Sequence, residues 1–379
     1  MKAIIAIDSF KGCLTSIEAE QCAAQGLHAA FPDCEISCIP VADGGEGMLE
    51  ILLNTANGKR IIVEAHDPLM EIQQTHYGIS VDKHTAFIEM ANISGLPLVP
   101  VEKRNPLLTT TFGTGELIKD ALERGCRNFV IGIGGSATND AGLGMLQALG
   151  FRFLDSQGKE LGTGGQILSK VNTIEKCSVH PALKDSHFTI ACDVDNPFFG
   201  PSGAAYIFAP QKGADKEMVE ILDNGLQNLA KVIFEQTGKD ITLYPGAGAA
   251  GGMGGSMLAL LNAELKSGTQ LLLDALQFSE QIKGADFIIT GEGKSDRQTI
   301  MGKVPYGVLL EANKQQIPVI LIAGSIEDVD ELKQAGFQAI FSITPAPIPL
   351  EQAMQANYAR KNIQYTVEQI GNIMKMFSI

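Results

Sequence analysis

The sequence contains no tryptophan, and aromatic residues make up only 6% of its 379 residues. Its apolar packing must therefore depend on aliphatic side chains and methionine, within a composition of 45% hydrophobic and 19% charged residues that is typical of a globular protein. No apolar run approaches the roughly 18 residues of a membrane span. The first one, Ala3–Ile7, has only the length of a strand, so we expect a cytoplasmic protein with no secretory signal and no membrane partner.

Positive charge is also scarce. The formal net charge is −14, and no segment is rich in lysine and arginine. Nucleic-acid binding needs such a basic patch, so we exclude it and expect anions to be held by backbone N–H groups and a few fixed lysines. The seven cysteines form no CxxC pair and show no zinc spacing, which is typical of reduced thiols.

Several well-known catalytic motifs are absent. The sequence has no GxxxxGK[ST] segment, so it is not a P-loop nucleotidase, and it lacks the His-Arg-Asp and Asp-Phe-Gly triplets of protein kinases. The six histidines show no HExxH or comparable metal spacing, and no GxSxG nucleophile motif occurs. These absences exclude the commonest kinase and hydrolase classes.

Strands and helices alternate near both ends of the chain, and this alternation predicts parallel sheets with helices on their faces. Between about residues 60 and 90, short strand-like runs follow one another without long helices, which indicates an antiparallel meander in a second sheet. We therefore predict an α/β protein with two α/β domains. Residues 1–60 and 280–379 form one doubly wound domain, residues 61–279 are inserted as a domain with a mixed sheet, and the active site lies in the cleft between them.

Polar residues follow the first predicted strand. Asp8, Ser9 and Lys11 place a carboxylate, a hydroxyl and an ammonium group at a strand end. They suit a phosphate, a metal ion or a substrate hydroxyl, although a capped turn with a solvated lysine explains them equally well. The next turn places three glycines beside Asp43 and Glu46, which favours a ligand or Mg²⁺ site over a simple turn.

The segment Gly132–Asp140 is the clearest phosphate-type loop. It follows a predicted strand and opens a predicted helix, so its amide groups and the helix dipole face an incoming anion. Gly132, Gly134 and Ala137 also fit the GxGxxA fingerprint of dinucleotide-binding proteins, with Asp155 near the place of a ribose-binding acid. The polar residues of the loop favour phosphate and Mg²⁺ handling over hydride transfer.

Further strand ends carry acids or glycines. Asp193 and Asp195 suit a general base or a metal ligand, or a plain Asx turn. The run Pro245–Gly255 is compatible with a hinge, a phosphate loop or a close-packed helix start. Thr290–Asp296 groups two acids and a lysine, and Lys303 opens the next predicted helix, a pattern that favours catalysis over an exposed connection.

In this order, the motifs resemble those of the bacterial type I glycerate kinases along nearly the whole chain. The matching segments are Asp8–Gly12, Ala42–Gly47, Glu89–Leu96, Thr111–Glu116, Gly132–Asp140, Cys192–Pro197, Pro210–Ala214, Pro245–Gly252 and Thr290–Gly293. One departure is Ala141, where we expect glycine. The resemblance implies ATP-dependent phosphorylation of D-glycerate with Mg²⁺, with 2-phosphoglycerate favoured over 3-phosphoglycerate. It also implies one Rossmann- or flavodoxin-like domain and one that resembles a restriction-endonuclease core.

On this basis we assign roles as hypotheses. Asp193 is the favoured general base, followed by Asp43 and Asp296, and Lys11 completes the catalytic set. Asp43 and Asp193 are the candidate Mg²⁺ ligands. The candidates for nucleotide binding are Gly134, Gly135, Ser136, Thr138, Asn139, Gly248, Gly251, Glu292 and Lys303, and those for substrate binding are Asp8, Ser9, Lys294 and Arg297. The Gly134–Asn139 loop suits either nucleotide or glycerate.

Two other functional classes stay open from the residues alone. The GxGxxA fingerprint is compatible with a dinucleotide-dependent oxidoreductase that acts on a small hydroxy acid. A two-domain protein can also bind sugar acids as a non-catalytic sensor. For the kinase, the expected partners are D-glycerate and ATP, with a homodimer as a candidate assembly.

Overall fold

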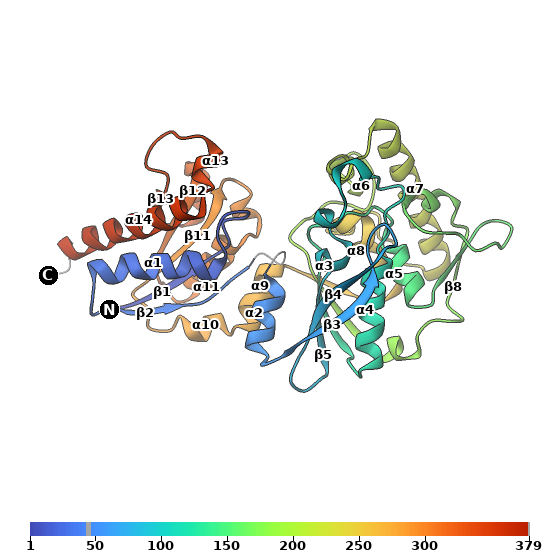
Figure 1. The fold of residues 1–379 in the computed structure, drawn as a ribbon, viewed down its shortest axis with the longest axis horizontal. Coiled ribbons are helices and arrows are strands. Elements are labelled where there is room, and N and C mark those ends of the chain that lie inside the picture. The colour runs from blue at the N-terminus through green and yellow to red at the C-terminus, as the bar shows by residue number, and fades with distance from the viewer. Residues whose placement is uncertain (43–46, 378–379) are drawn as a thin grey trace. The chain divides into compact units, whose positions relative to one another are not determined.

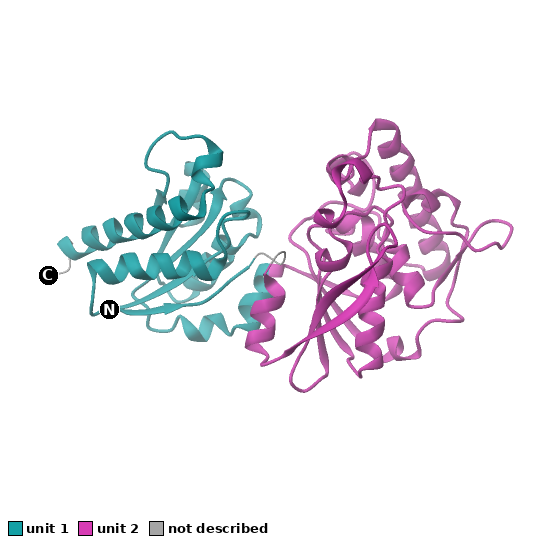
Figure 2. Ribbon diagram, in the orientation of Figure 1, with its two compact units in different colours: residues 1–43, 269–379 teal, residues 44–268 magenta. Residues whose placement is uncertain are grey.

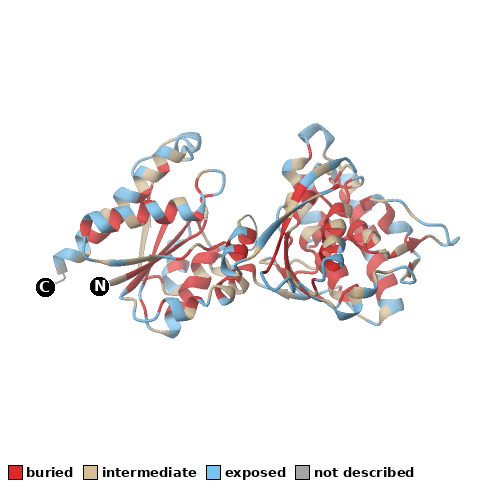
Figure 3. Ribbon diagram, turned by 60° about the horizontal axis from the view of Figure 1, so that its bottom comes forward, coloured by how far each residue is buried: buried red, intermediate tan, exposed pale blue. Residues whose placement is uncertain are grey.

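The computed structural model describes residues 1–42 and 47–377, so Asp43 lies outside the described residues. The chain divides into two compact units, which Figure 2 shows in separate colours. Unit 1 comprises residues 1–43 and 269–379, and unit 2 comprises residues 44–268. In each unit the buried residues gather on the strands and on the helix faces that cover them (Figure 3).

These boundaries differ from the sequence-based ones at 60/61 and 279/280, and helix packing explains the difference. Helix α2 (Met48–Thr55) belongs to unit 2 because its Leu49 and Leu53 side chains lie against Gly78 in the sheet of that unit. At the other boundary, Thr269 and Leu273 lie against Gly307 of unit 1. The side-chain contacts of α2 and of the helix Gly268–Ala275 therefore determine where each unit ends.

Unit 1 is built on a five-stranded parallel sheet (Figure 1). Its strands are β1 (Lys2–Ile7), β2 (Glu35–Cys38), β11 (Phe287–Ser295), β12 (Val319–Ile326) and β13 (Ala339–Ser342), in the spatial order β13-β12-β11-β1-β2. This is the flavodoxin-like order, which reverses direction between β1 and β11. The predicted parallel sheet, discontinuous in sequence, is confirmed.

Helices cover this sheet because its strands turn apolar side chains to both faces. Helices α1 (Ser16–Ala30) and α14 (Ala356–Phe377) pack side by side over one face (Figure 1). They approach so closely that a Cβ on Gly26 would lie 2.2 Å from the carbonyl oxygen of Gln364, so only glycine fits there. The other elements of this unit are α9 (Gly268–Ala275, which begins at the boundary), α10 (Phe278–Gln281), the 3₁₀ turn Thr299–Met301, α11 (Val304–Lys314), α12 (Val329–Ala335) and α13 (Leu350–Ala353).

Unit 2 contains a six-stranded mixed sheet and a separate hairpin. The sheet strands are β3 (Lys59–His66), β4 (Ile72–Ile79), β5 (Thr85–Glu89), β6 (Asn128–Gly132), β9 (His187–Ala191) and β10 (Glu264–Lys266), in the order β10-β9-β6-β5-β4-β3. The β3-β4-β5 part is antiparallel and the rest is parallel, so the predicted meander and mixed sheet are confirmed. The hairpin consists of β7 (Arg152–Leu154) and β8 (Thr173–Glu175).

The helices of unit 2 enclose a large apolar core on this sheet. They are α2, α3 (Ala91–Ser94), α4 (Phe112–Glu123), α5 (Leu143–Ala148), α6 (Ala204–Phe208), α7 (Lys216–Thr237) and α8 (Ala249–Leu260). The 3₁₀ turns are Leu96–Leu98, Val101–Lys103, Gly165–Lys170, Pro181–Asp185 and Pro210–Lys212. None of the helices in the described residues is long and apolar enough to cross a membrane.

The residue that caps helix α1 is Thr15, whose hydroxyl accepts the N–H of Glu18 while the Glu18 carboxylate accepts the N–H of Thr15. This reciprocal pair is a capping box. The segment after Thr290 was predicted to follow its strand, yet β11 continues to Ser295, because Gly291 allows close contact with Ile322 of β12.

Candidate active site

A pocket opens in unit 1 at the carboxyl ends of its parallel strands. It has a volume of about 480 Å³ and is lined from the ends of β1, β11, β12 and β13 and from the α13–α14 segment. The strand order reverses between β1 and β11, which is where open parallel sheets bind ligands. The lining includes six residues that the sequence singled out, which are Asp8, Ser9, Lys11, Glu292, Lys294 and Lys303.

The turn after β1 forms one wall of this pocket. Asp8 is 3% exposed, its Oδ1 accepts the N–H of Ser9 at 2.7 Å, and its own N–H donates to the carbonyl of Gly291 at 2.9 Å. These bonds hold the carboxylate at the strand end. Lys11, two residues beyond Ser9, is exposed and also lines the pocket. A carboxylate, a hydroxyl and an ammonium group therefore meet at one wall.

Glu292 is the buried acid of the pocket. One carboxylate oxygen accepts the hydroxyls of Thr299 at 2.6 Å and Ser295 at 3.0 Å, and the other lies 3.4 Å from Nζ of Lys303. Burial raises the pKa of Glu292, while the Thr299 hydroxyl and the Lys303 ammonium favour its charged form. The carboxylate is thus placed to orient Lys303, whose side chain is 30% exposed.

Lys294 lies on the same side of the pocket but is held by two acids. Its Nζ is 3.0 Å from Glu327 and 3.4 Å from Asp296, and these carboxylates, Glu327 first, raise the pKa of Lys294. The structure thus brings Asp296 beside the pocket through Lys294. It does not bring Arg297 there: among the described residues Arg297 is not part of the lining, and its backbone N–H donates to Asp328.

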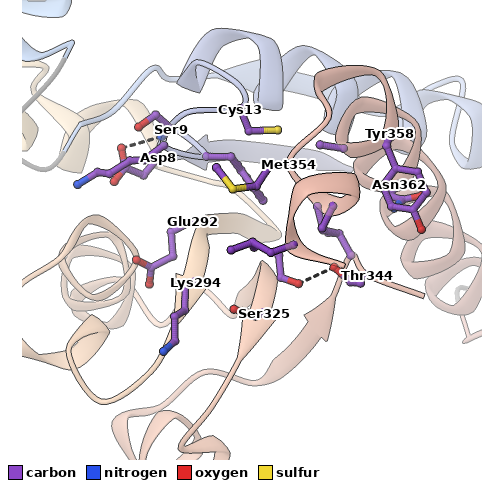
Figure 4. A pocket seen from close by; sticks show the side chains of 18 of the residues that line it. Asp8, Ser9, Cys13, Glu292, Lys294, Ser325, Thr344, Met354, Tyr358 and Asn362 are labelled. Atoms are coloured by element: carbon purple, nitrogen blue, oxygen red, sulfur yellow. Dashed lines mark hydrogen bonds between the residues drawn. The ribbon is translucent and has the colours of Figure 1, made fainter. Parts of the chain in front are cut away.

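The opposite side of the pocket is apolar. Figure 4 shows Asp8, Glu292 and Lys294 on one side and Tyr358 and Asn362 on the other. Apolar lining on that side comes from residues such as Ile343, Leu350, Ala353, Met354 and Ala359. An apolar wall that carries a single side-chain amide, that of Asn362, suits a flat heteroaromatic ring.

In unit 2, the predicted phosphate loop follows β6 and is tied to a buried lysine. Nζ of Lys212, which is 2% exposed, donates to Oγ of Ser136 at 2.7 Å and to the carbonyl of Thr138 at 2.6 Å. Next to it, Asn139 is completely buried, yet neither of its amide atoms has a hydrogen-bond partner among the described residues. Buried amides are normally bonded, so this one marks a place for a polar ligand or water.

Asp140, at the end of that loop, holds it in place through hydrogen bonds to backbone N–H groups. One oxygen of the fully buried Asp140 accepts the backbone N–H groups of Thr111 at 2.8 Å and Gly144 at 3.2 Å, and the other accepts that of Gly142 at 3.1 Å. Two threonine hydroxyls complete the set. Burial raises the pKa of Asp140, and these donors oppose the shift. The polar residues of this loop were expected to suit phosphate and Mg²⁺, but the carboxylate of Asp140 is fully occupied in holding the backbone of the loop.

The glycine-rich run Pro245–Gly255 supports the same loop. A Cβ on Gly251 would lie 2.3 Å from the carbonyl oxygen of Thr138, and one on Gly248 would lie 2.2 Å from that of Pro197. The carbonyl of Gly251 accepts the N–H of Ala141 at 3.1 Å. The glycines therefore permit close backbone contact at a kinked helix start, and their predicted role in nucleotide binding stays a prediction.

Two aspartates singled out by the sequence lie in different surroundings. Oδ1 of Asp193 accepts the Ser267 hydroxyl at 2.8 Å and the N–H of Gly268 at 2.9 Å, which orients its carboxylate. Asp155, the candidate ribose-binding acid, instead accepts the N–H groups of Gln157 and Lys159 in an exposed turn. No group of three histidine, cysteine or acidic side chains that could hold a metal ion occurs in residues 1–42 and 47–377.

Lys212 and Asn362 were missed as site residues. The sequence marked the segment around Lys212 without giving the lysine a role, because its burial is a property of the fold. Asn362 lies within a regular amphipathic helix, where no local motif distinguishes it. The burial of Lys212 and the place of Asn362 in the pocket lining become visible only in three dimensions.

A flavodoxin-like parallel sheet whose pocket at the switch point carries three lysines and two acids is typical of α/β enzymes that handle anionic ligands. The model of the glycerate kinase family matches residues 3–375, and the chain belongs to this family. It is therefore a kinase, and the comparisons give no support to the oxidoreductase considered above.

Its relatives match along almost their whole length. A glycerate kinase from Bacillus subtilis (strain 168) is 45% identical over 99% of this chain and 98% of its own. A glycerate 2-kinase from Escherichia coli (strain K12) is 47% identical over 97% and 98%. A crystal structure from Salmonella typhimurium LT2 that bears the name glycerate kinase 2 is 42% identical, covers 99% of this chain and 98% of its own, and superposes with a TM-score of 0.86.

Proposed function

We propose that the chain transfers the terminal phosphoryl group of ATP to a hydroxyl group of D-glycerate and that the product is 2-phosphoglycerate. Membership of the glycerate kinase family supports the reaction, and the name of the Escherichia coli relative supports the 2-position. The observation that carries the proposal is the pocket of unit 1, which has a charged side and an apolar side at the switch point of a parallel sheet.

In this proposal the pocket receives ATP. The adenine ring lies on the apolar side, against Met354 and Tyr358, and the phosphates lie on the side of Lys11 and Lys303. Phosphoryl transfer depends on positioning and on neutralising charge on the phosphate oxygens, and fixed ammonium groups do both. Glu292 contributes by holding Lys303 in place.

The donor set of the pocket fits Mg²⁺. Asp8 is a carboxylate fixed at the wall, and Mg²⁺ in kinases needs only one or two carboxylates because substrate phosphates and water supply its other ligands. When bound, the ion neutralises charge on the phosphates. Of the ligands expected from the sequence, Asp193 stays a prediction, and Asp43 lies outside the described residues.

We propose that the Gly134–Asn139 loop of unit 2 binds glycerate. Its amide groups follow a strand, and the unpartnered side chain of Asn139 offers a donor and an acceptor to an acid with hydroxyl groups. For the general base we retain Asp193, whose carboxylate is oriented by Ser267 and Gly268. A base of this kind removes the proton of the attacking hydroxyl.

A coupled ATP assay on D-glycerate tests the reaction, and feeding the product directly to enolase tests the position, because enolase accepts only the 2-phosphate. Absence of ATP consumption would refute the proposal, and a product inert to enolase would refute the 2-position. Asp193→Asn should lower kcat by at least about 100-fold with ATP still bound. The control is Asp185→Asn, at an exposed acid of unit 2 outside every candidate site, which should leave kcat unchanged.

A further inference from the structure

Lys212 is a charged group buried in unit 2 with no solvent to stabilise it. It ends the 3₁₀ turn Pro210–Lys212, and the next residue, Gly213, has a φ of 95° and lies against the backbone of Arg104. Removing an ammonium group from water costs several kcal/mol, and this cost is offset only by good partners. The partners of Lys212 are two neutral oxygens, those of Ser136 and Thr138. Two neutral oxygens only partly offset the desolvation cost of the ammonium group, so packing alone does not explain a lysine at this position.

The two bonds determine the shape of the Gly134–Asn139 loop. They fix a side chain and a carbonyl that flank Ala137, so the ammonium group bridges the middle of the loop. An ammonium group has three N–H donors, and these bonds use two of them. The hydroxyl of Thr138 and the amide of Asn139 are buried without a partner among the described residues. Donors and acceptors thus remain to be satisfied where the lysine holds the loop.

We propose that Lys212 is the positioning residue of the acceptor site: it holds the Gly134–Asn139 loop in the shape that receives the acid and gives this loop its positive charge. This inference rests on the proposed function, in which the loop binds glycerate. The carboxylate of glycerate then meets a loop that holds a buried ammonium group. The two contacts of this ammonium group are neutral oxygens, so neither of them cancels its charge.

The charge of Lys212 is sensitive to pH near neutrality. Burial lowers the pKa of Lys212 to about 7, and the negative charge of Asp140 opposes this shift. The N–H of Gly213 donates to the carbonyl of Pro210, and the guanidinium of nearby Arg104 donates to the carbonyl of Val99. Because an anion binds the protonated lysine better, the KM for glycerate should rise as the pH rises above that pKa and level off at the value expected for the variant without the lysine.

Steady-state kinetics of three variants test the proposal. Lys212→Met should raise the KM for D-glycerate by about 10- to 100-fold, the loss expected for a hydrogen bond to a charged group, and leave the KM for ATP within about twofold. Lys212→Arg, which keeps its charge at every pH, should restore glycerate binding and flatten the pH profile. Lys216→Met, at an exposed lysine of the same segment, is the matched control. An unchanged KM for glycerate, or equal losses for both substrates, would overturn the proposal.

Hydrogen exchange separates this inference from the proposed function. If the wild-type protein fails to phosphorylate glycerate, the proposed function fails, but the effect of Lys212 on the loop is still measured without substrate. Amides of residues 134–140 should then exchange at least about tenfold faster in Lys212→Met than in Lys216→Met, because the loop loses both of its ties. Equal exchange in the two variants would overturn the role of Lys212.

Discussion

Replacing Asp140 by alanine would remove the acceptor at which three backbone N–H groups of unit 2 converge. These groups belong to Thr111, Gly142 and Gly144, and they are bonded at 2.8–3.2 Å to a carboxylate that is completely buried. Each buried donor left without a partner costs about 1–3 kcal/mol. The desolvation cost of the carboxylate disappears in the variant and offsets part of the loss, so we expect a net destabilisation of about 3 kcal/mol.

Two further variants sharpen this expectation. Asp140→Asn keeps one oxygen for Thr111 and Gly144 but turns an NH₂ group toward the N–H of Gly142, so it should cost only about 1–2 kcal/mol. Asp155→Ala removes a carboxylate that also accepts two backbone N–H groups, but in an exposed turn where water replaces it. Its cost should stay below about 1 kcal/mol.

Urea unfolding followed by circular dichroism measures these differences, and hydrogen exchange assigns them to unit 2. With an m value of about 2–3 kcal/mol/M for a unit of this size, Asp140→Ala should lower the unfolding midpoint by roughly 1 M. If Asp140→Ala and Asp155→Ala shifted the midpoint equally, the burial of these donors would carry no special cost and the reasoning would be refuted.

Other predictions concern the pocket and core of unit 1. Lys303→Met should raise the KM for ATP by about 10-fold or more, whereas Lys333→Met, at an exposed lysine, should not; equal values would remove Lys303 from phosphate binding. Asn362→Leu should raise the KM for ATP several-fold, about 1 kcal/mol, without lowering kcat, and a drop in kcat alone would contradict a role in base binding. Burial raises the pKa of Glu20 from 4.5 to about 9, so its contribution to stability is complete below about pH 4.5 and is lost as the pH rises through 9. Denaturation at several pH values should therefore show wild type losing stability relative to Glu20→Gln over this range, and parallel curves would refute it.

Much of the fold could be predicted because the periodicity of apolar residues is a local property. The strands Lys2–Ile7 and Asn128–Gly132 lie where the sequence predicts strands, over the apolar run before Asp8 and directly before the Gly132–Asp140 loop, since each is a short, largely buried run bounded by polar residues or glycine. The predicted ends of strands and units were wrong where tertiary contacts determine them. Strand β11 passes through its glycine motif because β12 pairs with it as far as Ser295.

The candidate site also contains residues that the sequence could predict and residues that it could not. Asp8 and Glu292 could be found because they lie in motifs at strand ends, and parallel strands bring such ends together. The apolar side of the pocket comes from the end of β13, from α13 and from α14, and the sequence of α14 shows only the pattern of an ordinary amphipathic helix. At Ala141 the resemblance led us to expect glycine, and the structure gives the reason. The φ of Ala141 is 51°, a conformation that is unfavourable for a residue with a Cβ and is easily adopted by glycine.

The discontinuous composition of unit 1 has a consequence for the order of events during synthesis. Strand β1 is made first, but its partner β11 and the packing partner of α1, helix α14, emerge only after all of unit 2. Unit 2 is continuous in sequence and can complete its core on the ribosome. The first 42 residues must therefore wait, with one edge of β1 unpaired, until the last third of the chain arrives. A nascent chain arrested far enough beyond residue 268 for all of unit 2 to have left the ribosomal tunnel should accordingly resist proteolysis throughout unit 2, while its N-terminal segment is cleaved.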